Sequence, residues 1–159
     1  MDNEFSDVFL KPEAKLGYLF WQINMLWLRK VNKSLLDIGL THTQLITLAA
    51  TESLNHTTDR VIQRDVAEKI KVDRMLISKL VSKLVEAELL QKKNSAEDSR
   101  VNLLSLTSTG RKLLHDASGI LEKNEGEFFG LIEEDVPFLK KKLRKLLQLT
   151  EEEFNSSKK

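Results

Sequence analysis

Residues 63–84 read QRDVAEKIKVDRMLISKLVSKL, and they predict the architecture of the central part of the chain. The apolar residues of 63–70 recur at helical spacing, which predicts a short helix that ends in a two-residue turn. Asp73 follows the turn, and its carboxylate suits the start of a second helix that runs to about Glu88. Two short helices joined by a tight turn form a helix-turn-helix, which many DNA-binding proteins use.

The second predicted helix has two chemically different sides. At about 100° per residue, one side gathers apolar residues for the core: Ile77, Leu80, Val81 and Leu84. The opposite side gathers six residues, none of them acidic: Arg74, Met75, Ser78, Lys79, Ser82 and Lys83. Such a surface suits the major groove of DNA, which presents phosphates and base acceptors. For Met75 two possibilities stay open, contact with a thymine methyl group or packing on a neighbouring loop.

A β-hairpin is predicted after this helix. Two short apolar stretches, 89–92 and 101–106, flank the polar stretch 94–100, a pattern typical of two strands with a long tip. Helix, turn, helix and hairpin in this order make a winged helix-turn-helix. The predicted wing adds Lys92 and Lys93 to the residues expected to contact DNA.

Long helices are predicted on both sides of this lobe. The first spans 11–38 and ends at Gly39, and the apolar run 16–28 within it covers nearly every face of the helix. In a chain this short, such a helix indicates burial against a partner subunit. A helix capped by Thr107 and a last helix from about 135 to 153 complete the prediction of a mainly α fold with a small β wing.

Composition excludes several classes of protein. The chain has 159 residues, 41% hydrophobic and 31% charged, which suits one folded domain. It has no Cys, so disulfides, thiol switches and thiolate nucleophiles are excluded, and a cytoplasmic location is expected. The run 16–28 is shorter than the roughly 20 apolar residues of a membrane-spanning helix, so no membrane partner is expected.

The net charge of +1 is unevenly distributed along the chain. Residues 57–112 hold twelve basic and eight acidic side chains, which makes this segment +4 and leaves −3 for the rest. A local positive segment is what a DNA-binding surface requires.

The sequence resembles the MarR family of bacterial winged-helix transcriptional regulators, in register from Leu40 to Gly110. The matching motifs, in order, are Leu40-Thr41-x-x-Gln44-Leu45, Asp65-Val66-Ala67-Glu68-Lys69-Ile70, Val72-Asp73, Ile77-Ser78-Lys79-Leu80-Val81, Asp98-Ser99-Arg100 and Leu106-Thr107-x-x-Gly110. The chain departs from the family at Met75 and Leu76, where small polar residues are common. Base contacts there are then apolar, or shift to Arg74, Ser78 and Lys79.

The resemblance implies a homodimer that regulates transcription from a palindromic operator on double-stranded DNA, as a ligand-responsive repressor. The expected organisation is a single domain over 1–159, with a DNA-binding lobe at 40–111 and dimerisation helices at 1–38 and 112–159. The Asp73 helix would enter the major groove. Arg100 on the wing would enter the minor groove, with its guanidinium held by the Asp98 carboxylate. The rival hypothesis is a winged-helix protein-interaction adaptor that does not bind specific DNA.

Without Cys, regulation by a small aromatic or amphipathic effector stays open. Four residues could contribute to its site, unless they only fill the core and the dimer interface: Tyr18, Trp21, Met25 and Trp27. His42 and His115 lack the local spacing of metal ligands, although the two could meet in space as in the few zinc sensors of the family. No cofactor, no metal and no enzymatic activity are expected, because no catalytic constellation or phosphate-binding loop stands out.

Overall fold

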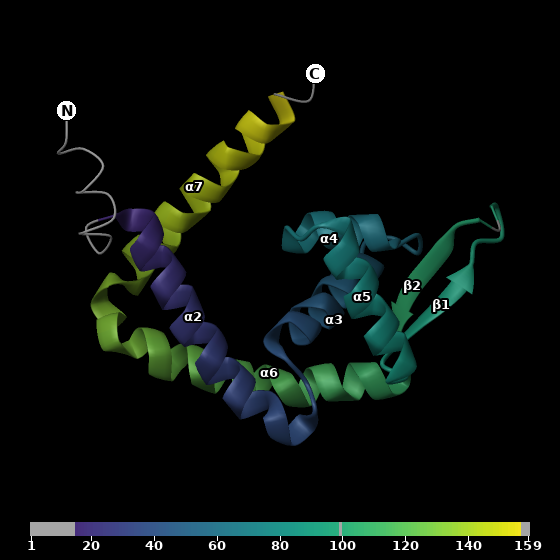
Figure 1. Cartoon of the computed structure of the whole chain (residues 1–159), viewed down its shortest axis with the longest axis horizontal. Helices are drawn as coiled ribbons and strands as arrows, with labels where there is room; N and C mark the ends of the chain where they lie inside the picture. Colours follow the sequence, from purple (N-terminus) through teal and green to yellow (C-terminus); the bar gives the residue numbers. More distant parts are fainter. Residues whose placement is uncertain (1–14, 99, 157–159) are drawn as a thin grey trace, which may run out of the picture. The chain divides into compact units, whose positions relative to one another are not determined.

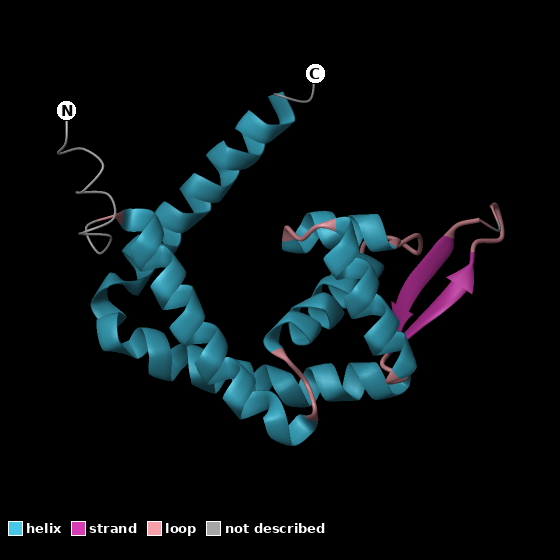
Figure 2. Cartoon of the chain, viewed as in Figure 1, coloured by secondary structure: helices cyan, strands magenta, loops and turns pink. Residues whose placement is uncertain are grey.

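The computed structural model of the chain describes residues 15–98 and 100–156. Helices dominate, and a two-stranded antiparallel sheet projects from them as a wing (Figures 1 and 2). The predicted fold class, mainly α with a small β wing, is confirmed. The elements in chain order are α2 (Leu16–Leu35), η2 (Leu36–Ile38), α3 (His42–Asn55), α4 (Gln63–Ile70), α5 (Arg74–Glu86), β1 (Leu90–Asn94), β2 (Asn102–Leu106), α6 (Ser108–Phe129), η3 (Gly130–Asp135) and α7 (Val136–Ser156).

The chain divides into two compact units, and the boundary between Leu121 and Glu122 falls inside α6. The first unit contains the buried core, to which α2, α3, α4, α5, both strands and α6 contribute apolar side chains. The division into a DNA-binding lobe at 40–111 and dimerisation helices at 1–38 and 112–159 stays a prediction. No helix in the described ranges is long and apolar enough to cross a bilayer.

Local capping signals set the ends of the helices in the first unit. At the start of α3, the Thr41 amide donates to Oε1 of Gln44 (2.9 Å) and the Gln44 amide donates to Oγ1 of Thr41 (3.3 Å), as the capping box predicts. At the start of α5, the Leu76 amide donates to Oδ1 of Asp73 (2.7 Å). Gly39 adopts the predicted left-handed conformation, with a φ of 70°.

The first helix differs from its prediction. The α-helix ends at Leu35, and one 3-10 turn carries the chain on to Ile38. Residues 11–14 of the predicted range lie outside the described part of the chain. The 3-10 turn tightens the end of the helix before Gly39, a common way for a helix to satisfy its last carbonyl groups.

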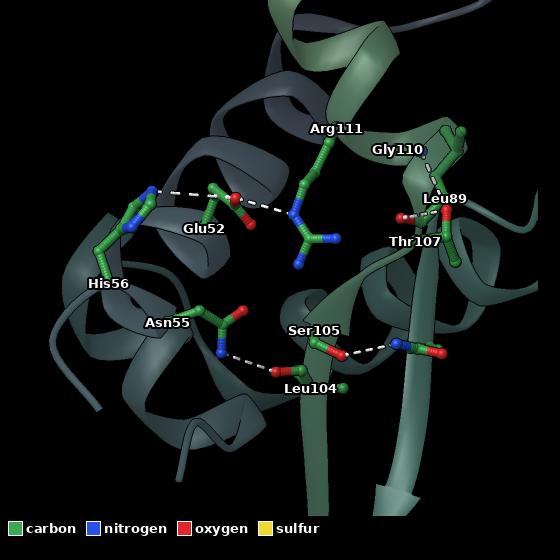
Figure 3. Close-up of polar contacts among 10 residues, drawn as sticks. Glu52, Asn55, His56, Leu89, Leu104, Ser105, Thr107, Gly110 and Arg111 are labelled. Carbon is green, nitrogen blue, oxygen red and sulfur yellow. Dashed lines mark hydrogen bonds and ion pairs between the residues drawn. The ribbon is translucent and has the colours of Figure 1, made fainter. Parts of the chain in front are cut away.

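The start of α6 is tied closely to the segment between α5 and β1. Thr107 caps α6 as predicted, because its Oγ1 accepts from the Gly110 amide (2.9 Å). The Thr107 hydroxyl also donates to the Glu88 carbonyl (2.7 Å), and the Thr107 amide donates to the Leu89 carbonyl (3.1 Å). Gly110 approaches so closely that a side-chain carbon there would overlap the Leu89 carbonyl oxygen (Figure 3).

His42 makes the stability of the fold sensitive to pH. Its ring packs edge-on against Trp27, with ring centroids 6.1 Å apart, and burial lowers the pKa of His42 below its ordinary 6.5. Between that lowered pKa and 6.5, the unfolded chain binds a proton that the folded chain does not. The stability of the folded state therefore rises with pH through this window and is lost as the pH falls through it.

Urea unfolding at a series of pH values between about 5 and 8 tests this sign. The wild-type midpoint is expected to fall on acidification below 6.5, and His42→Gln is expected to flatten that part of the profile. His115→Gln is the control, because His115 is exposed on α6. A wild-type midpoint that rises on acidification would contradict the argument.

Candidate nucleic-acid interface

Helix α5 has the two sides that the sequence predicts. Its four predicted core residues are buried. The six residues expected on the other side are all exposed: Arg74, Met75, Ser78, Lys79, Ser82 and Lys83. The buried side holds α5 against the lobe, because removing these apolar groups from water stabilises the packing. The exposed side is thereby presented on a rigid helix.

The exposed side of α5 is cationic over most of its length. In the described ranges, Arg74, Lys79 and Lys83 take part in no ion pair. The first acidic residue within the helix is Glu86, its last residue. Unpaired cations on a rigid helix favour binding of a polyanion, because binding releases the counterions that the polyanion had condensed.

The short turn between α4 and α5 relies on a left-handed residue. Lys71 follows the last residue of α4 and has a φ of 60°. Its neighbour Val72 donates its amide to the Ala67 carbonyl (3.1 Å).

The start of α4 has no side-chain cap, because Ile62, which precedes the helix, has no side-chain acceptor. Asp65 Oδ2 accepts from the Ile62 amide (3.1 Å), which fixes the residue before α4 but caps no amide of the helix itself.

The strands of the wing are shifted from their predicted bounds. β1 and β2 pair antiparallel from Leu90 opposite Leu106 to Asn94 opposite Asn102. β1 spans Leu90–Asn94 where 89–92 was predicted, and β2 spans Asn102–Leu106 where 101–106 was predicted, because backbone pairing and not apolar character sets where the strands begin and end. Lys92 and Lys93 lie within β1 and are exposed.

The Asp98 carboxylate does not hold the Arg100 guanidinium, so this part of the prediction was wrong. Its Oδ1 accepts from the backbone amide of Arg100 (2.9 Å), and the Val101 amide donates to the Asp98 carbonyl (2.9 Å). Aspartate carboxylates commonly accept from the amide two residues on in a turn, since the reach is short. Both side chains are exposed, and within the described ranges no ion pair joins them. Asp98 thus shapes the backbone of the wing tip, and the Arg100 side chain is available to a ligand.

Polar contacts that the sequence did not indicate hold the wing and the start of α6 to α3 (Figure 3). Arg111 Nε, on α6, donates to Oε1 of Glu52 on α3 (3.0 Å). Asn55 Nδ2, also on α3, donates to the Leu104 carbonyl of β2 (3.1 Å). These partners lie dozens of residues apart in the chain, so no periodicity or motif could have paired them. The Asn55 contact holds β2 of the wing to α3, and the Arg111 contact holds the start of α6 to α3.

The structure divides the four candidate effector residues into different environments. The rings of Tyr18 and Trp21 stack with centroids 5.9 Å apart. Trp21 and Met25 line an open groove of about 380 Å³ on α2. Trp27 instead packs at the edge of the core and against His42. Within one protomer, the four residues do not form a single site.

Replacing Arg100 with alanine is expected to weaken binding to duplex DNA by about 1–3 kcal/mol. A narrow A·T-rich minor groove has an enhanced negative potential that attracts arginine, so A·T-rich flanks should matter less to the variant. Fluorescence anisotropy with duplexes that differ only in their flanks measures both effects. Glu97→Ala is the control, because Glu97 at the same tip forms only an exposed ion pair with Arg60 (3.4 Å). Equal affinities of Arg100→Ala and wild type would contradict the assignment.

Comparison with known proteins identifies the family. Residues 29–117 match the family model described as transcriptional regulator SarA/Rot. The HTH-type transcriptional regulator YdcH of Bacillus subtilis is 31% identical over 126 residues, which cover 79% of this chain and 86% of YdcH.

Solved structures share the fold. The MepR–DNA complex of S. aureus has 26% identity and a TM-score of 0.72, with 86% of this chain and 96% of MepR covered. CouR of Rhodococcus jostii RHA1, bound to p-coumaroyl-CoA, has 28% identity and a TM-score of 0.69, with 86% and 91% covered. A MarR-family regulator from Rhodococcus sp. RHA1 also matches, which confirms the resemblance that the motifs indicate. The chain therefore belongs to the SarA/Rot family of transcriptional regulators.

Proposed function

We propose that this regulator is a homodimeric repressor that binds a palindromic operator on double-stranded DNA and responds to a small ligand. The observation that carries the proposal is the exposed, unpaired cationic side of α5 in a winged helix-turn-helix. The likeness to MepR, whose structure contains DNA, supports the choice of partner. A chain without Cys also suits the reducing cytoplasm.

The proposed contacts divide between two grooves. The six exposed residues of α5 would meet base edges and phosphates in the major groove, where the N-terminal residues of a recognition helix read bases. Arg100 would enter the adjacent minor groove, with Asp98 shaping the tip that carries it. Lys92 and Lys93 on β1 would contact phosphates, which add affinity without sequence information.

Exposed apolar surface on α2 supports the dimer. Phe20 and Trp21 are each 56% exposed in the protomer, and Leu26 is 52% exposed. Large apolar patches on a protein surface usually mark an interaction site. A two-fold dimer presents two recognition helices with matching orientation, which is why a palindromic operator is expected.

The proposal of a small effector rests on the open groove beside Trp21 and Met25. CouR is similar to this chain and binds p-coumaroyl-CoA, which supports an aromatic or amphipathic effector class. Two copies of α2 brought together would enlarge the apolar lining. Release of bound DNA by added aromatic acids or their thioesters is the corresponding test.

In-vitro selection of bound duplexes from a random library, followed by anisotropy titration at fixed salt, tests the function. A palindromic consensus bound at least about 1,000-fold more tightly than random DNA is expected. If no selected duplex is bound more tightly than random DNA, the DNA-binding proposal fails. The protein-interaction adaptor then becomes the better hypothesis.

Introducing a charge into the apolar surface of α2 is expected to break the dimer. Phe20→Glu would place a carboxylate in the proposed interface, where burial of an unpaired charge is costly. Analytical ultracentrifugation at micromolar concentration should show a dimer for wild type and a monomer for the variant. Ala96→Glu at the exposed wing tip is the control and should remain dimeric. A folded wild-type monomer under these conditions would contradict the proposal.

A further inference from the structure

Two adjacent apolar side chains stand out on the DNA-binding lobe. Of the residues described between 40 and 121, only Met75 and Leu76 are large hydrophobics with exposed side chains, at 72% and 39%. All other large apolar side chains of this segment are buried or partly buried. The two residues lie in the first turn of α5, separated from the capping residue Asp73 by Arg74.

Met75 points away from the core more directly than Leu76 does. At about 100° per residue, Met75 lies opposite the centre of the buried side of α5, whereas Leu76 lies near its edge. The high exposure of Met75 shows that it does not pack on a neighbouring loop of its own protomer. A methionine in this position is available to contact a partner, and its flexible side chain adapts to the shape of an apolar group.

The surroundings of Met75 indicate what that partner is. Ser78 and Lys79 follow it one turn along the same side of α5, and Arg74 precedes it. All three are exposed, and in the described ranges neither cation is ion-paired. An apolar side chain surrounded by cations and hydroxyls fits a surface that is anionic overall and carries an isolated apolar group. The major groove has this composition, because thymine presents its C5-methyl group beside acceptors and phosphates.

We infer that Met75 is a specificity-determining residue that recognises the C5-methyl group of a thymine in each half of the operator. This inference rests on the proposed function. It predicts that the selected half-site contains a thymine at a position contacted by the first turn of α5. Deoxyuridine pairs with adenine as thymine does but lacks the C5-methyl group. Replacing the contacted thymine with deoxyuridine should therefore lower the affinity although base pairing is preserved.

Replacing individual thymines of the selected operator with deoxyuridine tests the inference, with the full-length protein and anisotropy titration. Burial of one methyl-sized group corresponds to about a fourfold change in affinity. Deoxyuridine at the contacted position of one half-site should therefore weaken wild-type binding about fourfold. In both half-sites the loss should be roughly 15-fold, because the free-energy changes at two distant sites add and the affinity factors therefore multiply.

The matched variant is Met75→Ala, which removes the side chain from both protomers. It should bind the thymine operator more weakly than wild type, by a factor similar to that for deoxyuridine in both half-sites. It should also bind the thymine and deoxyuridine operators equally well. Lys141→Gln, on the exposed surface of α7 and outside the proposed interface, should keep the wild-type preference for thymine. Thermal unfolding of each variant checks that the fold is intact, which is expected because both side chains are exposed.

Three outcomes would overturn the inference while leaving the proposed function standing. One is a specific operator whose half-sites lack thymine. Another is unchanged wild-type affinity for deoxyuridine at every thymine position. The third is a Met75→Ala variant that still prefers thymine to the same extent. If selection yields no specific duplex, the proposed function itself fails, so the two failures are distinguishable.

Discussion

Gly110→Ala is expected to destabilise the folded protein by about 3 kcal/mol, at the upper end of the cost of overpacking. The added methyl group would overlap the Leu89 carbonyl oxygen, which is a backbone atom and cannot rotate away as a side chain can. That carbonyl also accepts from the Thr107 amide (3.1 Å), so moving it weakens the junction between α6 and the segment after α5. The midpoint of urea unfolding, compared at one protein concentration, measures the loss.

The control for this prediction is the same substitution at another glycine of the same helix, Gly119. Gly119 also lies in α6, but a side-chain carbon there would meet no atom within 4 Å. Gly119→Ala should therefore stabilise the protein by about 0.5–1 kcal/mol, because alanine loses less backbone entropy than glycine when a helix forms. If Gly110→Ala is as stable as wild type, the close approach of residue 110 to the Leu89 carbonyl is not required for folding.

The second large effect is expected on DNA binding. Changing Arg74, Lys79 and Lys83 together to glutamine should reduce affinity for the selected operator by at least 100-fold, because each side chain that binds DNA contributes about 1–3 kcal/mol. The slope of log affinity against log salt should also become shallower by about 0.9 for each phosphate that a lobe no longer neutralises. Titrations at several salt concentrations measure both quantities.

Helix α7 offers a charge-matched control. Lys141, Arg144 and Lys145 are also two lysines and one arginine, and all three are exposed. Changing them to glutamine alters the net charge by the same amount but leaves the α5 surface intact. This variant should keep wild-type affinity and salt dependence. Equal losses in the two triple variants would indicate that only net charge matters, which would contradict a specific interface on α5.

The features that were predictable from sequence depend on residues close together in the chain. The capping residues Thr41 and Asp73 act on amides three residues away. The two sides of α5 follow from helical periodicity alone, since each turn of a helix repeats the same geometry. The order of the motifs was then sufficient to indicate a winged-helix regulator, because short-range signals set the elements and their sequence.

Other features depend on tertiary packing, and the chain offers no local signal for them. The close approach of Gly110 to Leu89 and the hydrogen bond from Arg111 to Glu52 join segments that meet only when the core has formed. The aromatic residues of α2 illustrate the same limit, since Trp27 packs at the core while Trp21 stays exposed. Periodicity and capping act over three or four residues, whereas these contacts depend on the three-dimensional course of the whole lobe.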